Sequence, residues 1–216
     1  MSVPETEIEP ESVDNDLDYV RTERRASTTV LGWLLAVGGA IGMLASAILV
    51  IERIRLLEDP AYKPSCSFNP VVTCGQVMES WQGSLFGFPN PIIGVAAFPV
   101  VATVGVVLLA GVRLPRWFWL GLNLGALAGA VFVTWLFTQS VYLIGALCPY
   151  CMVVWAVTIP IFVYVTGYNL SEGYIKVSPA LRRGLVDSRG LIVAGWYTLI
   201  AVLITIEFWD RWYLVF

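Results

Sequence analysis

Residues 146–167 read ALCPYCMVVWAVTIPIFVYVTG, an uncharged apolar stretch that opens on the motif Cys148-Pro149-Tyr150-Cys151. A transmembrane helix needs about 20 predominantly apolar residues, so this stretch is long enough to cross a bilayer. Proline suits the first position of a helix, which places the start of the helix near Cys148. The segment therefore combines a predicted membrane span with a C-x-x-C pair at its end.

Further spans are predicted from runs of similar length and composition. They lie at about 30–51, 91–112, 117–143 and 190–206. The third and fourth runs of the chain are nearly continuous, but Gln139-Ser140 and Cys148-Pro149 supply a break between them. With 57% hydrophobic and 13% charged residues and a mean hydropathy of +0.74, the chain is predicted to be an all-α integral membrane protein with five transmembrane helices.

The charged residues exclude several functions. Half of the 16 acidic residues lie in the first 25 positions, and the net charge is only -3, so no basic surface for nucleic acid is expected. Residues 1–29 are interpreted as an acidic, disordered tail. The chain has no histidine, which removes the usual general base, haem ligand and most zinc sites.

The Lys and Arg residues predict the orientation in the membrane, because they concentrate in cytoplasmic loops. Nine of the 13 fall on one side of the predicted spans: Arg21, Arg24, Arg25, Arg113, Arg116, Lys176, Arg182, Arg183 and Arg189. The N-terminus is then cytoplasmic, and the loop 52–90 and the turn near 140–147 are external. An alternative is that residues 21–47 form a signal peptide, since Ala45-Ser46-Ala47 resembles a cleavage site.

Both cysteine pairs fall on the external side in this orientation. Cys66 and Cys74 lie in the loop and could form a purely structural disulfide or a redox pair. The pair Cys148 and Cys151 favours redox chemistry, because a short C-x-x-C disulfide adds little stability and a helix N-terminus stabilises a thiolate. A four-cysteine zinc site is the other alternative, although the first pair is too widely spaced for a typical zinc knuckle. At the edge of a bilayer, the natural acceptor for two thiol electrons is a lipid-soluble quinone.

Several segments together resemble the vitamin K epoxide reductase family, in its bacterial disulfide-forming branch. They are a first helix, the segment Cys66-x₇-Cys74-Gly-Gln-Val followed by Trp81, the segment Phe88-Pro89-Asn90-Pro91-Ile92-Ile93-Gly94 before the second span, and the Cys148–Cys151 motif. The resemblance covers roughly residues 30–167. It implies a four-helix bundle around a quinone of the menaquinone or ubiquinone type, with one additional helix, in the bacterial cytoplasmic (inner) membrane.

The resemblance also implies roles for individual residues. Cys66 and Cys74 would shuttle electrons from a thioredoxin-like partner to Cys148, and Cys151 would be the thiol nearest the quinone. Asn90 would donate a hydrogen bond to a quinone oxygen, although from the residues alone it could instead cap the following helix.

Two departures from the family pattern affect these expectations. Vertebrate members have a tyrosine where this chain has Trp155, and an indole cannot donate a hydrogen bond from the same place. Some bacterial relatives carry a fused thioredoxin-like domain after the fifth helix, whereas this sequence stops at Phe216. The expected partner is therefore a separate thioredoxin-like (DsbA-like) thiol oxidase.

Three other functions compete with this interpretation. A DsbB-type quinone reductase also has two cysteine pairs, but in the reverse order along the chain. A tetraspan-like structural protein would have a loop stapled by Cys66 and Cys74 and an inert C-x-x-C pair. A transporter is disfavoured because the spans bury no charge and offer only Asn123 and Gln139 for a substrate path.

The spacing Gly121–Gly125–Gly129 is interpreted as a helix-packing face.

Overall fold

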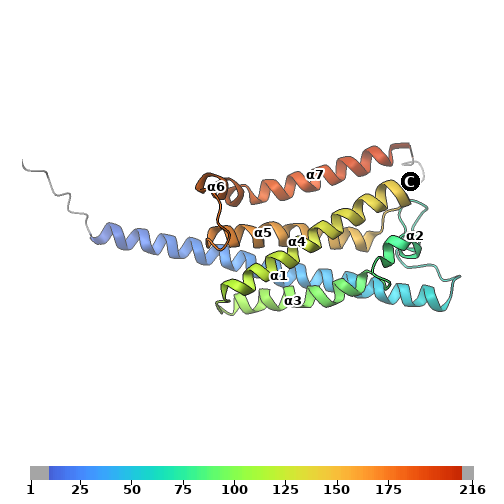
Figure 1. Ribbon diagram of the computed structural model, residues 1–216, viewed down its shortest axis with the longest axis horizontal. Helices are drawn as coiled ribbons and strands as arrows, with labels where there is room; N and C mark the ends of the chain where they lie inside the picture. The colour runs from blue at the N-terminus through green and yellow to red at the C-terminus, as the bar shows by residue number, and fades with distance from the viewer. Residues whose placement is uncertain (1–9, 211–216) are drawn as a thin grey trace, which may run out of the picture.

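Five long helices dominate the fold. The computed structural model describes the backbone of residues 10–210 and the side chains of residues 27–210. Its five helices that are long and apolar enough to cross a membrane are α1 (Pro10–Glu58), α3 (Pro91–Leu109), α4 (Arg116–Thr138), α5 (Pro149–Ser171) and α7 (Arg189–Glu207). They run side by side as an elongated bundle (Figure 1). The prediction of five transmembrane helices is confirmed.

The first helix is longer at both ends than the expected span 30–51. It begins at Pro10, within the acidic segment that was expected to be disordered, and ends at Glu58. Extending an existing helix costs much less than nucleating one, and acidic residues near a helix N-terminus interact favourably with the helix dipole. The start of the predicted tail, residues 1–9, lies outside the described residues.

Helices α1, α3, α4 and α5 form the core of the bundle. α1 packs closely along α3, where a Cβ on Gly39 would lie 2.6 Å from the backbone nitrogen of Ala102. α7 contacts α5, where the Tyr197 hydroxyl donates to the carbonyl of Ala156, but α7 has no buried residue in the described part of the chain. The fold is therefore a four-helix bundle with one peripheral helix.

The glycines of α4 do not form the packing face that their spacing suggests. A Cβ on Gly121 or Gly125 would meet no other described atom within 4 Å, and one on Gly129 would only touch Thr158 Cγ2 at 3.5 Å. All three glycines instead line a cavity, and among the described residues only Thr158 of α5 comes within contact distance of this face.

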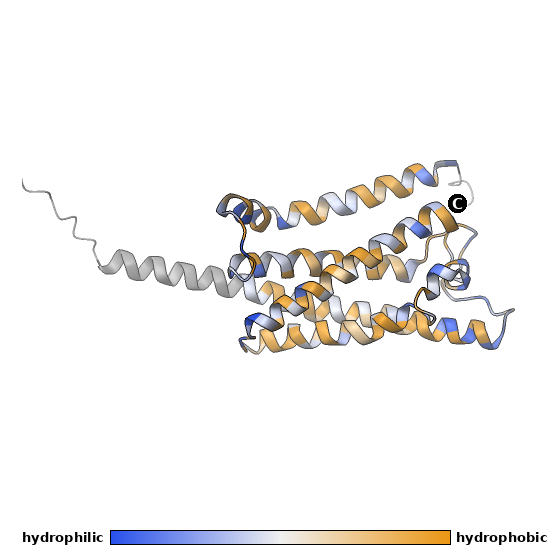
Figure 2. Ribbon diagram, viewed as in Figure 1, coloured by the Kyte–Doolittle hydropathy of each residue, from blue (hydrophilic) through white to orange (hydrophobic). Residues whose placement is uncertain are grey.

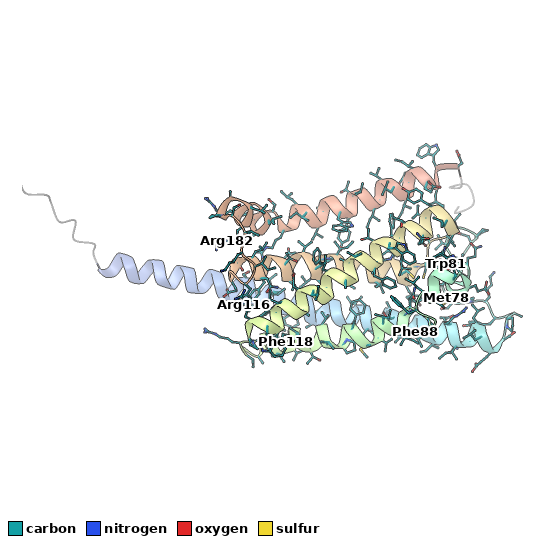
Figure 3. All side chains as sticks on the ribbon, in the orientation of Figure 1. Met78, Trp81, Phe88, Arg116, Phe118 and Arg182 are labelled. Atoms are coloured by element: carbon teal, nitrogen blue, oxygen red, sulfur yellow. A yellow bond between two sulfur atoms is a disulfide. The ribbon has the colours of Figure 1, made fainter. Side chains whose placement is uncertain are left out.

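Short elements complete the two ends of the bundle. They are α2 (Gly75–Glu79), the 3₁₀ helix η1 (Trp81–Ser84), the π-helix η2 (Gln139–Ile144) and α6 (Pro179–Asp187). Met78 and Trp81 lie at the end that carries the loop, and Arg116 and Arg182 lie at the opposite end (Figure 3). Apolar residues predominate along the helices between these ends (Figure 2). Among the described residues, the only β-structure is a single parallel bridge between Val72 and Leu147.

Candidate functional site

The loop cysteines form a buried disulfide. Cys66 and Cys74 are bonded, with their Cα atoms 5.7 Å apart, and their exposed fractions are 2% and 0%. Cys74 directly precedes α2, and both cysteines pack with Leu49 and Leu56 of α1. The loop disulfide is therefore buried against the first transmembrane helix.

A buried carboxylate holds the chain just before Cys66. Glu52 of α1 is only 4% exposed, and its carboxylate accepts hydrogen bonds from the Ser65 hydroxyl at 2.7 Å, the Ser65 backbone N–H at 3.2 Å and the Tyr62 hydroxyl at 3.1 Å. A carboxylate at the edge of an apolar bundle is tolerated when its oxygens are hydrogen-bonded in this way. Glu52 thus fixes the loop to the first transmembrane helix.

The C-x-x-C pair begins the fourth transmembrane helix. Cys148 is the N-cap of α5, Pro149 occupies its first turn, and the backbone N–H of Cys151 points at Cys148 Sγ from 3.4 Å. Both cysteines carry free thiols. The pKa of the Cys148 thiol is held below its ordinary value, chiefly by a hydrogen bond from the Cys151 thiol and also by backbone N–H groups of Tyr150 and Cys151, while burial acts in the opposite direction. Cys148 thus has the features of an attacking or leaving thiolate.

The two cysteine pairs are in direct contact. Cys148 Sγ lies 3.2 Å from Cys74 Sγ, although the two residues are 74 positions apart in the chain. A backbone bridge aligns the segments that carry them, because Thr73 N–H donates to the carbonyl of Leu147 at 3.0 Å and Leu147 N–H donates to that of Val71 at 2.7 Å. A thiolate at Cys148 is therefore beside the disulfide sulfur of Cys74, the arrangement that thiol–disulfide exchange requires. In this state Cys66 and Cys74 are bonded to each other, so they are not available as thiolate ligands for zinc.

A large cavity opens beside the C-x-x-C pair. Its volume is about 540 Å³, and its walls come from α1, α2, η1, α3, α4, η2 and α5. Most of the lining side chains are apolar. The polar ones gather in a small set: Ser46, Gln82, Asn90, Gln139, Ser140, Cys151 and Thr158. Cys151 lines the cavity, whereas Cys148 faces Cys74, so the motif contacts both the loop disulfide and the cavity.

Asn90 lies at the start of α3 but does not cap that helix. Its side chain makes no capping hydrogen bond. Instead, Asn90 Nδ2 donates to the carbonyl of Gln82 at 2.6 Å, and Asn90 Oδ1 accepts from the backbone N–H of Leu85 at 3.1 Å. Asn90 therefore closes the turn between η1 and α3, and it also lines the cavity.

Trp155 forms part of the cavity wall. Its indole is 4% exposed and packs edge-to-face on Phe137, with ring centroids 5.1 Å apart. The structure thus places this sequence-predicted residue at the cavity as an aromatic surface. Asn123, considered for a substrate path, donates instead to the Thr166 hydroxyl at 2.8 Å and joins α4 to α5.

Sequence reasoning missed Gln82 and Glu52. Gln82 is 5% exposed, lines the cavity, and extends Nε2 toward Gln139 Oε1 at 3.5 Å. The only sequence signal for Gln82 is a polar residue beside Trp81 in a loop, which is common on protein surfaces. Gln139 was recognised as a helix break, and it begins the π-helix η2, an element frequent at functional sites.

Comparison with protein families supports the resemblance. The model of the vitamin K epoxide reductase family matches residues 33–166, which is more than half of the chain and includes all four cysteines. The chain belongs to the vitamin K epoxide reductase family. No curated protein sequence matches it.

Membership of the vitamin K epoxide reductase family makes the protein a multi-pass membrane oxidoreductase that acts on thiols and quinone-like substrates. The family generally works with thioredoxin-like partners. This activity favours a redox function for the two cysteine pairs over the alternative of a structural protein with a stapled loop.

Proposed function

We propose that the protein reoxidises a thioredoxin-like partner and passes two electrons, through Cys66/Cys74 and then Cys148/Cys151, to a quinone in the bilayer. The observation that carries the proposal is the position of the C-x-x-C pair. Cys148 Sγ lies 3.2 Å from Cys74 Sγ, while the neighbouring Cys151 lines the cavity. One short motif therefore connects a protein disulfide to an apolar binding site.

The first stage is exchange between the pairs. The partner's two thiols reduce the Cys66–Cys74 disulfide and leave as a disulfide. The Cys74 thiolate then attacks Cys148 of a Cys148–Cys151 disulfide, which forms the Cys74–Cys148 bond and releases Cys151 as a thiolate. Cys66 attacks Cys74 and releases Cys148. The resulting state has a loop disulfide and two free C-x-x-C thiols, as in the structure.

The second stage returns the C-x-x-C pair to its oxidised form. Cys148 and Cys151 together give two electrons and two protons to the quinone, which leaves as quinol, and a disulfide forms between them. Cys151 is the thiol beside the ring, because it is the one that lines the cavity. Asn90 offers its free amide hydrogen to a ring carbonyl, and Trp155 supplies an apolar wall.

The cavity has room for a quinone of the menaquinone or ubiquinone type with an apolar tail. Met78 and Phe118 both line it and lie near opposite ends of the bundle (Figure 3), so the cavity extends along the helices. Between these ends, Gly121 and Gly125 leave open space on α4. We place the ring at the end with the polar side chains and the tail along these glycines.

The loop has to open before the partner can react. Cys66 and Cys74 are 2% and 0% exposed, so a protein thiol of a separate thioredoxin-like (DsbA-like) oxidase cannot reach either sulfur while the loop is closed. Cys74 is occupied by its contact with Cys148. Cys66 is therefore the sulfur that we assign to the partner.

The proposed location is the bacterial cytoplasmic membrane, with the N-terminus inside and both cysteine pairs near the outer face. The basic residues support it, because Arg116 and Arg182 lie at the end of the bundle away from α2 and the loop. A membrane-impermeant thiol reagent should label the loop cysteines of intact cells after mild reduction. Labelling only in inside-out vesicles would reverse this orientation.

The decisive experiment mixes the fully reduced, purified protein with a quinone in the absence of oxygen and follows quinol absorbance. We expect one quinol for each protein molecule from the C-x-x-C pair, with a second as the loop pair follows. The Cys151→Ala variant, which cannot form the C-x-x-C disulfide, is the matched control. If the wild-type protein forms no quinol, the proposed function is wrong.

A further inference from the structure

One buried side chain at the cavity has a hydrogen-bonding atom that nothing in the described chain satisfies. Gln82 is only 5% exposed, and its side-chain oxygen Oε1 is buried without a hydrogen-bond partner among the described residues. Buried polar atoms are nearly always paired, so an unpaired one deserves an explanation. Because Gln82 lines the cavity beside Asn90 and Cys151, the natural partner for its oxygen is the molecule that occupies the cavity.

One backbone contact and one side-chain contact position Gln82. The backbone carbonyl of Gln82 accepts the 2.6 Å hydrogen bond from Asn90 Nδ2, which anchors η1 to the start of α3. The side-chain nitrogen Nε2 points at Gln139 Oε1 from 3.5 Å, a long contact that nevertheless leaves Oε1 as the free end of the amide. Two of the lining hydroxyls also have partners within the protein, since Ser140 donates to the Ala146 carbonyl and Thr158 to that of Val154.

The free atom is an acceptor, and this determines which form of the ligand it recognises. A quinone ring carries two carbonyl oxygens, which only accept hydrogen bonds, whereas a quinol carries two hydroxyls, which donate them. Gln82 Oε1 can therefore bond to the reduced ring and not to a carbonyl of the oxidised one. We propose that Gln82 is a positioning residue that binds a hydroxyl of the quinol product, with Gln139 holding the amide in the accepting orientation. This inference rests on the proposed quinone reduction and adds a preference for the reduced state.

The test compares how substrate and product bind to a Gln82→Met variant, which keeps the length and the backbone carbonyl but loses the acceptor. Menadione serves as the quinone and menadiol as the added product, with dithiothreitol as reductant under anaerobic conditions. We expect the inhibition constant of menadiol to rise about 3- to 10-fold, the effect of one lost hydrogen bond, while the KM for menadione changes less than twofold. Gln139→Met retains the Gln82 oxygen and should weaken menadiol binding by a smaller factor.

Several outcomes would overturn the assignment. A purely structural role for Gln82 would raise the menadione KM and the menadiol inhibition constant by the same factor. An Oε1 that is satisfied by water alone would leave both unchanged. If Gln82→Met does not fold, Gln82→Leu also removes the acceptor, and unchanged menadiol inhibition in that variant contradicts the proposal. Absence of menadiol formation by the wild-type protein would instead remove the proposed function itself.

Discussion

Thr73 donates its backbone N–H to the carbonyl of Leu147 at 3.0 Å, and each of these residues directly precedes a cysteine of a different pair. The bond belongs to the isolated parallel bridge between Val72 and Leu147. It sets the loop and the start of α5 in register, so that Cys74 and Cys148 are brought within 3.2 Å. A main-chain hydrogen bond, rather than a side-chain contact, thus aligns the two cysteine pairs between which electrons are proposed to pass.

Removing this backbone donor should slow exchange between the cysteine pairs. In Thr73→Pro the N–H is lost, and we expect electron transfer from the loop thiols to Cys148–Cys151 to slow about 3- to 10-fold, because the two sulfurs are no longer held together. Rapid-quench alkylation after reduction of the loop measures this rate. Thr73→Ala keeps the N–H and is the control; equal slowing in both variants would assign the effect to the Thr73 side chain.

A trapped intermediate should identify the sulfur that attacks the C-x-x-C pair. In Cys66→Ala/Cys151→Ala neither resolving cysteine remains, so we expect mild oxidation to yield a stable Cys74–Cys148 disulfide. Mass spectrometry of peptides digested without reduction detects it directly.

The control for this trap is Cys74→Ala/Cys151→Ala. It leaves Cys66 and Cys148, and the contact in the structure is made by Cys74. Efficient formation of a Cys66–Cys148 disulfide would show that the order of the relay is reversed.

Substitution of Asn90 should affect both stability and turnover, because its amide has internal partners as well as a free hydrogen. Asn90→Ala leaves the Leu85 N–H and the Gln82 carbonyl unpaired, which should lower the free energy of unfolding by about 1–3 kcal/mol. The kcat/KM for quinone should fall about 2- to 10-fold. Asn90→Asp keeps the acceptor for Leu85 but removes the donor. Normal quinone kinetics in Asn90→Asp would restrict Asn90 to a structural role.

Much of the fold follows from the sequence because it depends on local properties. The lengths of the apolar runs predict the five spans. The Cys148-Pro149 pair predicts a helix that starts near Cys148, and α5 begins at Pro149. The family resemblance, carried by the cysteine spacings and the segment around Asn90, is confirmed by the match over residues 33–166. These features are encoded within short stretches of chain.

Features that depend on contacts between distant segments could not be predicted. Cys74 and Cys148 meet only because the loop folds over the end of the bundle, and their positions in the sequence do not predict this contact. The glycines of α4 were interpreted as a packing face, yet they line open space, because small residues suit both a close helix contact and a cavity wall. Gln82 became a candidate only once its burial and unpaired oxygen were known.

The open space beside α4 gives a test for where an apolar quinone tail lies. A leucine at Gly125 would meet no other described atom at its Cβ, and leucine is a better helix former than glycine, so Gly125→Leu should fold. Its side chain would project into the cavity and displace a tail that lies there. We expect kcat/KM for a long-chain menaquinone to fall about tenfold or more, the effect of overfilling a packed site, while menadione, which has no tail, changes less than twofold. Gly195 on α7 also has open space at its Cβ but does not line the cavity. The variant Gly195→Leu therefore controls for the change in helix propensity. Equal losses with both quinones would mean that the leucine disturbs the ring site, and unchanged kinetics with the long-chain quinone would place the tail elsewhere.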